Sequence, residues 1–383
     1  MSGAGIRFTL LTGANTPVPA PPSLIDALES VEVSHSDADR SGFQIQFRVG
    51  RVGQGGIGNQ NDYALLASPS LATNNRVILV VHFGAFPKVL MDGVITHQQL
   101  APGMEPGTST LTVTGEDLTL VMDQENKQAE HPAQGEMVIV FKILGRYSRF
   151  GLIPAVIPPK VFDVPVPTDR IPVQSGTDLA YLREMAGRYG YVFYVKPGPA
   201  PFTNTAYWGP PIRFGTPQHA LTVGMGHFTN VDSIHFENDS LQPTLVTGKV
   251  QDRKTNKVSP VKIFSTLRLP LAQKSVLTTQ RKNARKVPFR DSGLTTSQAR
   301  ARAQAMTDES MDRVVTATGE LDTIRYGHVL EARKLVGLRG VGKSYDGLYY
   351  VKSVTHRLRP GAYTQSFVLT REGTGTTVPG VFV

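Results

Sequence analysis

The sequence of 383 residues contains no cysteine. Without thiols the chain can form no disulfide framework, no Cys-ligated zinc site, no iron–sulfur cluster and no thiol nucleophile. Long apolar runs are also missing: the longest, Val77–Val81 and Met137–Phe141, are far shorter than the roughly 18 residues of a membrane-spanning helix. The first eleven residues hold one basic residue and an apolar run too short for a signal peptide. We therefore expect a protein made in the cytoplasm, with no membrane insertion of its own.

Tryptophan occurs once, and charged residues make up 19% of the chain, whereas 37 glycines and 27 prolines are present. Glycine and proline together exceed their usual share of about 12%. Both residues favour turns, so this composition indicates a β-rich architecture rather than a helical bundle. At roughly 150 residues per domain, the length predicts two to three domains.

Alternating apolar residues predict strands in the first 120 residues. In the segment 43–49, phenylalanine, isoleucine and valine alternate with glutamine and arginine, which is typical of a half-buried strand. Further β-rich segments follow at 76–83, 89–96 and 111–114, with no long helix between them. We expect residues 1–120 to form an antiparallel sheet or a small β-barrel.

The middle of the chain has a different character. Thr177 is suited to cap a helix whose first turn holds Asp178 and which ends at Gly190, and a second helical pattern covers 135–147. Proline-rich borders enclose these helices, so 121–215 is expected to be a small inserted α/β domain. Residues 216–372 return to β-strands, interrupted by a basic excursion at 252–295 and a helix at 296–313, with Met306 on its apolar face. The remaining residues, 373–383, are expected to form a flexible tail.

Positive charge is concentrated in one segment. Residues 1–150 have a net charge of −4 and residues 151–383 a net charge of +13. The segment 249–302 holds 14 basic and two acidic residues, and nucleic acid is one partner for such a segment. Aromatic residues for base stacking are sparse there, however, so the pattern favours a solvated loop or a protein interface. The candidate interface residues are Lys274, Arg281, Lys282, Arg285, Lys286 and Arg290.

Motifs for catalysis or metal binding are weak. Residues 337–344 (GLRGVGKS) fit the spacing of a phosphate-binding loop, but the next residues predict a turn and a strand instead of the required helix. Nine histidines are present without a helical pair at metal-ligand spacing, and no nucleophile-elbow motif occurs. We expect no cofactor and no enzymatic activity. A cell-wall or polysaccharide hydrolase using a pair of distant carboxylates stays an alternative, and so does a nucleic-acid-binding protein using 249–302.

Several ordered motifs carry a resemblance to a known family. Residues 340–356 (GVGKSYDGLYYVKSVTH) and 360–371 (PGAYTQSFVLTR) resemble the end of baseplate hub proteins of contractile tails. These proteins include the phage late control D family, the hub half of VgrG spikes and the hubs of extracellular contractile injection systems. Earlier stretches are similar to other parts of such hubs, in the same order: 111–118 (LTVTGEDL), 174–191 (QSGTDLAYLREMAGRYGY), 207–211 (YWGPP) and 236–248 (FENDSLQPTLVTG).

The resemblance implies a mainly β, α+β fold with two tail-tube-like β-barrels and an inserted α/β domain. It implies a non-enzymatic homotrimer whose six barrels form a pseudo-six-fold ring, because a trimeric spike must meet a hexameric tube. The expected partners are an inner-tube or tube-initiator protein, a spike protein and other baseplate proteins of the LysM or wedge type. The chain would then be a component of an assembled phage tail or contractile particle.

Overall fold

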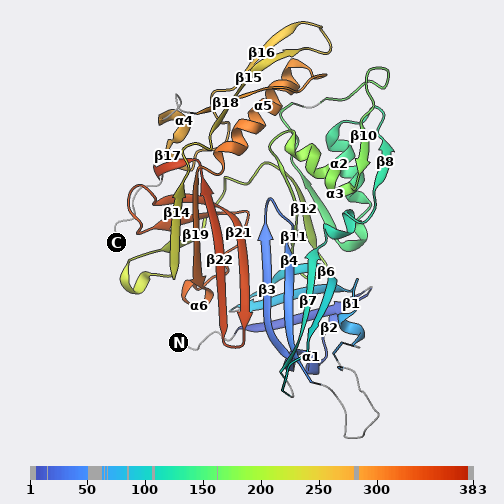
Figure 1. Cartoon of the computed structure of the whole chain (residues 1–383), viewed down its shortest axis with the longest axis vertical. Coiled ribbons are helices and arrows are strands. Elements are labelled where there is room, and N and C mark those ends of the chain that lie inside the picture. The colour runs from blue at the N-terminus through green and yellow to red at the C-terminus, as the bar shows by residue number, and fades with distance from the viewer. Residues whose placement is uncertain are drawn as a thin grey trace.

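The computed structural model describes residues 6–14, 16–50, 63, 65–66, 68–83, 86–105, 108–161, 163–279 and 284–377. The protein is mainly β, as predicted, and a large sheet runs along the long axis of an elongated molecule (Figure 1). This sheet contains 13 of the described strands, most of them antiparallel to their neighbours. Its order is β14 (Ser233–Asn238), β19 (Val315–Asp322), β22 (Ala362–Arg371), β21 (Gly347–Arg359), β3 (Leu28–Ser36), β4 (Gly42–Val49), β7 (Ser109–Asp117), β6 (Phe86–Ala101), β5 (Arg76–Phe83), β1 (Arg7–Gly13) and β2 (Val18–Pro19), with β20 (Leu335–Arg339) beside β21 and β13 (Gln218–Thr222) beside β20.

One strand pair joins the two halves of the chain. Strand β21 pairs with β22 on one edge and with β3 on the other, in a register that places His356 opposite Val33. Because both edges of β21 are occupied, the first-half and second-half strands form one continuous sheet. Among the described strands, the pairing closes neither half into a barrel, in contrast to the two separate barrels that we expected.

Most buried side chains lie on one face of this sheet, and a small cluster of Ile78, Val80 and Val89 lies on the other face. Strand β4 buries Phe43, Ile45 and Phe47, as its alternation predicts, and these residues pack in a core with other first-half side chains. Leu358 and Tyr363 of the second half complete that core, whereas most second-half apolar residues form a separate cluster around β19, β21 and β22. The two halves therefore share apolar contacts as well as backbone hydrogen bonds.

The inserted unit is a three-stranded sheet covered by two helices. The sheet has the order β11 (Val192–Pro197), β12 (Asn204–Gly209) and β9 (Leu152–Val156), and the helices are α2 (Glu136–Gly145) and α3 (Asp178–Gly187). A two-stranded ladder of β8 (Lys127–Glu130) and β10 (Val173–Gly176) lies beside them. Thr177 caps α3 as predicted, since its hydroxyl accepts a hydrogen bond from the Ala180 amide. Trp208 is fully buried, and its indole nitrogen donates to the Leu182 carbonyl.

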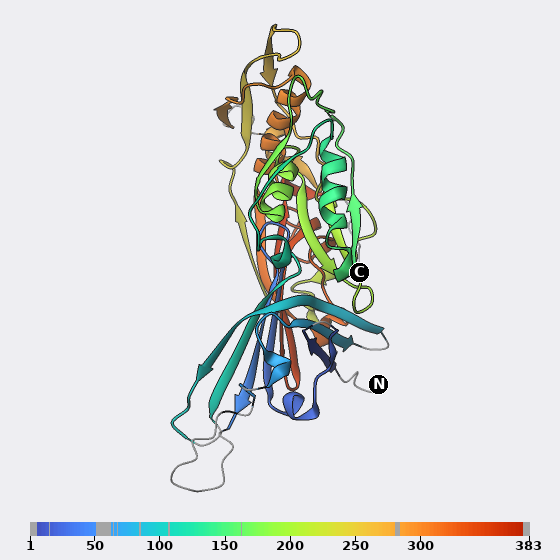
Figure 2. The same cartoon turned by 90° about the vertical axis from the view of Figure 1, so that its right-hand side faces the viewer.

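The basic excursion forms structure that its sequence did not predict. Strands β16 (Val258–Lys262), β15 (Thr244–Gln251) and β18 (Arg285–Pro288) make a small sheet against α5 (Thr296–Met311). This sheet and the ends of the first-half strands occupy opposite ends of the molecule (Figure 2). Met306 is 41% exposed, so it does not lie on the buried face of α5 as we expected.

Short elements complete the fold. Residues 373–376, which we predicted as part of a flexible tail, form β23 (Gly373–Thr376) paired with β17 (Ala272–Ser275). The other short elements are α1 (Pro22–Asp26), α4 (Val276–Thr279), α6 (Thr323–Tyr326) and the 3-10 turns η1 (Pro69–Leu71), η2 (Leu120–Met122), η3 (Ser148–Phe150) and η4 (Gly226–Phe228). In the described part of the chain, no helix is long and apolar enough to cross a membrane.

Candidate functional site

The large sheet presents a polar surface on the side opposite its apolar cores. Alternate residues of β3, β4, β7, β19, β21 and β22 carry mostly polar groups there, and the strand register places them side by side. Thr355 of β21 lies between Ser366 of β22 and Ser34 of β3, so this surface crosses the seam between the halves. We call it the polar face, and its members are Ser34, Gln44, Thr112, Thr114, Thr318, Ser353, Thr355 and Ser366.

Charged groups on the polar face form a salt-bridged cluster that keeps one net negative charge. The Arg357 guanidinium bridges Glu32 at 3.2 Å and Glu320 at 3.3 Å, which connects β21 to β3 of the first half and to β19 of the second half. Tight protein interfaces have an apolar core, and this row of small hydroxyl and amide groups offers none. The polar face is therefore suited to contact with water or with a molecule that passes along it.

The small sheet presents a basic surface. Val246, Val250 and Val261 pack against α5, so the alternate residues of the same strands point away from the helix. These outward positions include three lysines, one on each strand of the sheet. We call this surface the basic face, and its lysines are Lys249, Lys262 and Lys286.

The candidate interface residues are only partly placed. Lys274, Arg285, Lys286 and Arg290 are exposed, and none of them forms an ion pair with another described residue. Arg281 and Lys282 lie outside the described residues. Their role in an interface stays a prediction.

Several other cations of the basic segment are neutralised within the fold. Arg253 reaches Asp163 of the inserted unit at 3.3 Å, and Arg302 reaches Asp291 at 3.0 Å. Asp163 lies outside the segment 249–302 in the sequence, so a net charge counted within that segment omits this pair. The segment 249–302 therefore has less unpaired positive charge than its sequence indicates.

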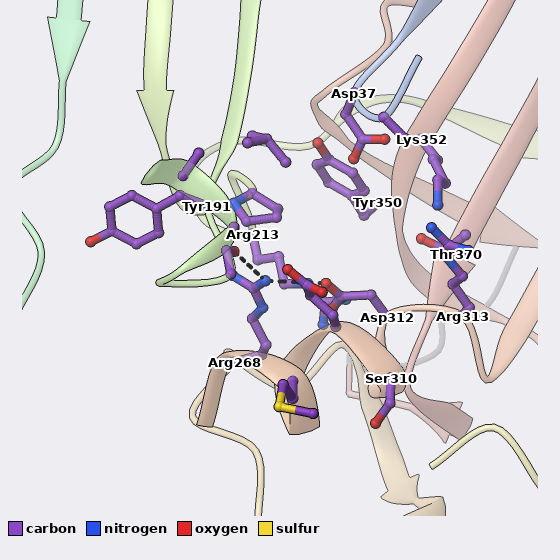
Figure 3. Close-up of a pocket in the computed structure, with 18 of the residues that line it drawn as sticks. Asp37, Tyr191, Arg213, Arg268, Ser310, Asp312, Arg313, Tyr350, Lys352 and Thr370 are labelled. Atoms are coloured by element: carbon purple, nitrogen blue, oxygen red, sulfur yellow. Dashed lines mark hydrogen bonds and ion pairs between the residues drawn. The ribbon is translucent and has the colours of Figure 1, made fainter. Parts of the chain in front are cut away.

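A pocket of about 650 Å³ lies where the inserted unit meets both halves of the chain (Figure 3). Arg213, which is buried, donates to Asp312 at 2.5 Å and to Glu372 at 3.0 Å. Arg268 pairs with Asp312 at 3.2 Å and donates to the Gly190 carbonyl at 2.8 Å. These charged contacts fasten the segment after the inserted unit to the end of α5. We call this cavity the junction pocket.

Two acidic side chains in the junction pocket have perturbed ionisation. Burial raises the pKa of the Asp37 carboxyl, although the nearby Lys352 opposes the shift. Burial likewise raises the pKa of Glu309, against the attraction of Arg268. Tyr350 lines the same pocket, and burial raises the pKa of its hydroxyl well above the usual value. Sequence reasoning missed this group because its members come from distant parts of the chain.

Arg333 makes a second polar junction. Its guanidinium donates to the Ser36 carbonyl at 2.5 Å and to the Ser41 hydroxyl at 2.9 Å, both in the first half. It also donates to the Val195 carbonyl of the inserted unit at 3.4 Å and lies over the Tyr194 ring at 3.9 Å. Burial lowers the pKa of this fully enclosed guanidinium. One second-half side chain therefore contacts both other parts of the protein.

The motifs considered for chemistry have structural explanations. The glycine-rich segment 337–344 spans the end of β20 and the following turn, and β20 pairs with β21 as an antiparallel hairpin, so no helix N-terminus follows it. His219 stacks on His328 with ring centroids 4.1 Å apart. Within the described ranges, no cluster of three or more His, Asp or Glu side chains is arranged to hold a metal ion.

Comparison with known proteins identifies the fold. No family model and no curated protein matches this chain by sequence. A tail protein from Neisseria meningitidis MC58 has a similar structure, with a TM-score of 0.64 and 12% identity over 97% of this chain and 98% of that one. The 43 kDa tail protein of prophage MuSo2 from Shewanella oneidensis is also similar, with a TM-score of 0.63 and 12% identity over 96% of this chain and 99% of that one. A chain of a Francisella PdpA-VgrG complex has a TM-score of 0.55 and 9% identity, and the match covers 99% of this chain and 60% of that one. The chain therefore has the fold of phage tail proteins, and VgrG-type complexes share it.

Proposed function

We propose that this protein is a non-enzymatic structural hub of a phage tail or contractile injection particle. In this role three copies form a ring that joins a hexameric inner tube to a trimeric spike. The fold shared with tail proteins along nearly the whole chain supports the particle assignment. The ordered sequence motifs support the more specific hub assignment.

The continuous polar face is the observation that carries the proposal. In a ring, each copy contributes both halves of its large sheet to the wall, and one face of that wall borders the channel. A face of mostly hydroxyl, amide and charged groups crosses the seam, with half-buried Val368 as an apolar position beside Ser353, and gives such a channel a wettable lining. The cluster of Arg357, Glu32 and Glu320 keeps only one net negative charge, so it offers a passing molecule little electrostatic attraction.

Exposed cations outside the large sheet support an assembly role. Complementary charges steer protein association and fix its register more than they add affinity. The basic face and the four placed candidate residues, Lys274, Arg285, Lys286 and Arg290, are expected to contact a neighbouring copy or a tube, spike, LysM-type or wedge protein. Such a particle component is made in the cytoplasm and leaves the cell in the assembled particle.

The first test is the native mass by light scattering, combined with electron microscopy of the same sample. The hub proposal predicts three times the 41.6 kDa chain mass and a ring with a central opening. Because the chain lacks cysteine, Ser366→Cys places a single thiol on the polar face. In the ring, that thiol should react with a small maleimide and be protected from a maleimide on a protein-sized carrier.

A matched variant, Met104→Cys, places the thiol on a fully exposed loop residue and should react with both reagents. A chain that stays monomeric, even when mixed with its tube and spike proteins, contradicts the proposal. Equal reaction of the Ser366→Cys thiol with both reagents in a trimer contradicts the placement of the polar face in a channel.

A further inference from the structure

An apolar groove of about 630 Å³ separates α5 from the proline-rich segments of the inserted unit. Three of its lining residues are large and strongly exposed: Phe214 at 66%, Leu267 at 64% and Leu269 at 54%. Tyr189 and Ala305 contribute to the same lining. Contiguous exposed apolar surface of this kind marks an interaction site, because isolated proteins rarely leave it in contact with water.

The groove has cations on its border. Lys160 and Arg300 both line it, are exposed, and form no ion pair with any other described residue. Asp308 also lines the groove, but its carboxylate already accepts hydrogen bonds from the Thr266 hydroxyl at 2.7 Å and the Leu267 amide at 2.9 Å. The border therefore has positive charge that an occupant can neutralise.

The groove adjoins the junction pocket. Four residues line both: Tyr191, Pro211, Arg213 and Arg268. Beyond them the junction pocket is lined by Arg183, Arg313 and Lys352, for which the described part of the chain supplies no ion-pair partner. Figure 3 shows the ends of Lys352 and Arg313 on the same side of this pocket. Asp312 is occupied by Arg213 and Arg268. Asp37 and Glu309 also line the pocket, near Lys352 and Arg313, but the lining still has more cations than carboxylates.

We propose that the groove and the junction pocket together bind an extended segment of another protein of the particle. Apolar side chains of that segment lie in the groove, and its Asp or Glu side chains reach the cations of the junction pocket. This inference rests on the proposed function, because it requires a particle in which such a partner is present.

Two other occupants fit the surface less well. Residues 378–383 of this chain are apolar but include no Asp or Glu, so they cannot satisfy the cations of the junction pocket through side chains. A nucleic acid would bring anionic charge, but it binds through base stacking on aromatic rings together with phosphate contacts. Tyr189, Tyr191 and Phe214 do line the groove, but the aliphatic side chains of Ile263, Leu267 and Leu269 line it with them, and this mixture favours apolar side chains of a polypeptide over stacked bases.

Protection of a single thiol tests whether the groove is covered. Leu269→Cys introduces the only thiol of the chain, and its maleimide labelling rate is compared between the purified protein and the assembled particle. We expect labelling at least about tenfold slower in the particle, with no comparable change for Met104→Cys. Equal labelling of Leu269→Cys in both states overturns this inference and leaves the hub proposal intact. Absence of the chain from the particle overturns both.

Photocrosslinking tests the identity of the occupant. A benzoylphenylalanine in place of Phe214 preserves an aromatic side chain in the groove, and mass spectrometry of irradiated particles identifies the joined peptide. We expect a peptide of a different protein with an Asp or Glu within about five residues of the crosslink, since an extended chain covers roughly 3.3 Å per residue. A crosslink to a second copy, to residues 378–383 or to nucleic acid overturns the proposal.

Charge reversal tests the ionic half of the surface. The double variant Arg313→Glu and Lys352→Glu should reduce the crosslink yield from the Phe214 position at least about fivefold. The conservative variant Arg313→Lys and Lys352→Arg should retain most of it. Far-ultraviolet circular dichroism and the thermal midpoint of each purified variant identify a folding defect. An unchanged yield in folded, charge-reversed protein overturns the assignment of carboxylates to the junction pocket.

Discussion

Replacing Arg333 with methionine should weaken the contact of the second half of the chain with the first half and with the inserted unit. Methionine retains an unbranched apolar stem but removes every hydrogen bond of the guanidinium. The change leaves buried acceptors at Ser36, Ser41 and Val195 without their donor. Methionine is preferable to glycine because residue 333 has a positive φ of 68°, and glycine would relieve that strain while removing the contacts.

The expected loss follows from these contacts. Hydrogen bonds to a charged group each contribute about 1.5–3 kcal/mol, and the ring contact with Tyr194 adds roughly 0.5–2 kcal/mol. Relief of the buried charge opposes these terms, since burial already disfavours the ionised guanidinium and lowers the pKa of Arg333. We expect the free energy of unfolding to fall by about 3 kcal/mol.

Urea unfolding measures this loss with two probes. Circular dichroism follows the whole chain, and the fluorescence of the single tryptophan, Trp208, follows the inserted unit that Arg333 contacts. The matched control is Arg325→Met, because the Arg325 side chain is 52% exposed and its ion pair with Asp232 should contribute less than about 1 kcal/mol. A loss for Arg333→Met within 1 kcal/mol of that control would refute the reasoning.

Three further predictions concern other parts of the fold. Burial alone would raise the pKa of Asp178, but hydrogen bonds from Lys127 and other donors outweigh it and hold the pKa below its usual value. The ionised carboxylate therefore stabilises the fold above about pH 4, and this contribution is lost as pH falls through the lowered pKa. Urea midpoints of Asp178→Asn and the unsubstituted protein should therefore differ at pH 7 and converge towards pH 3. Gly115→Ala should lower the free energy of unfolding by at least about 2 kcal/mol in urea titration, because the new Cβ would lie 2.3 Å from the Val94 carbonyl oxygen. Gly145→Ala in α2 meets open space and should raise the free energy of unfolding by up to about 1 kcal/mol. Changing all three lysines of the basic face to glutamate should weaken ring assembly in light scattering, and an effect that persists equally at high salt would contradict the electrostatic explanation.

Local sequence patterns predicted helices and strands well where the structure depends on residues close together in the chain. Thr177 caps α3 and the alternation at 43–49 forms β4, because capping and strand periodicity depend on residues only a few positions apart. The phosphate-loop spacing at 337–344 was correctly set aside, since the strand that follows was visible in the sequence. By contrast, residues 252–295 were predicted as a polar excursion, although they supply β16 and β18 of the small sheet. Both strands are short, and β18 pairs with β15 across a segment that holds β16 and β17.

The sequence by itself determined a mainly β chain with an inserted α/β unit, no thiol chemistry and an uneven charge distribution, because composition and short-range periodicity specify these properties. Only the tertiary structure decided that β3 and β21 join the halves into one sheet and that the polar face crosses this seam. Tertiary structure also decided which cations remain exposed, since the carboxylate that neutralises Arg253 lies 90 residues away along the chain. Strand register and charge pairing depend on contacts between distant residues, and a single sequence does not record which distant residues meet.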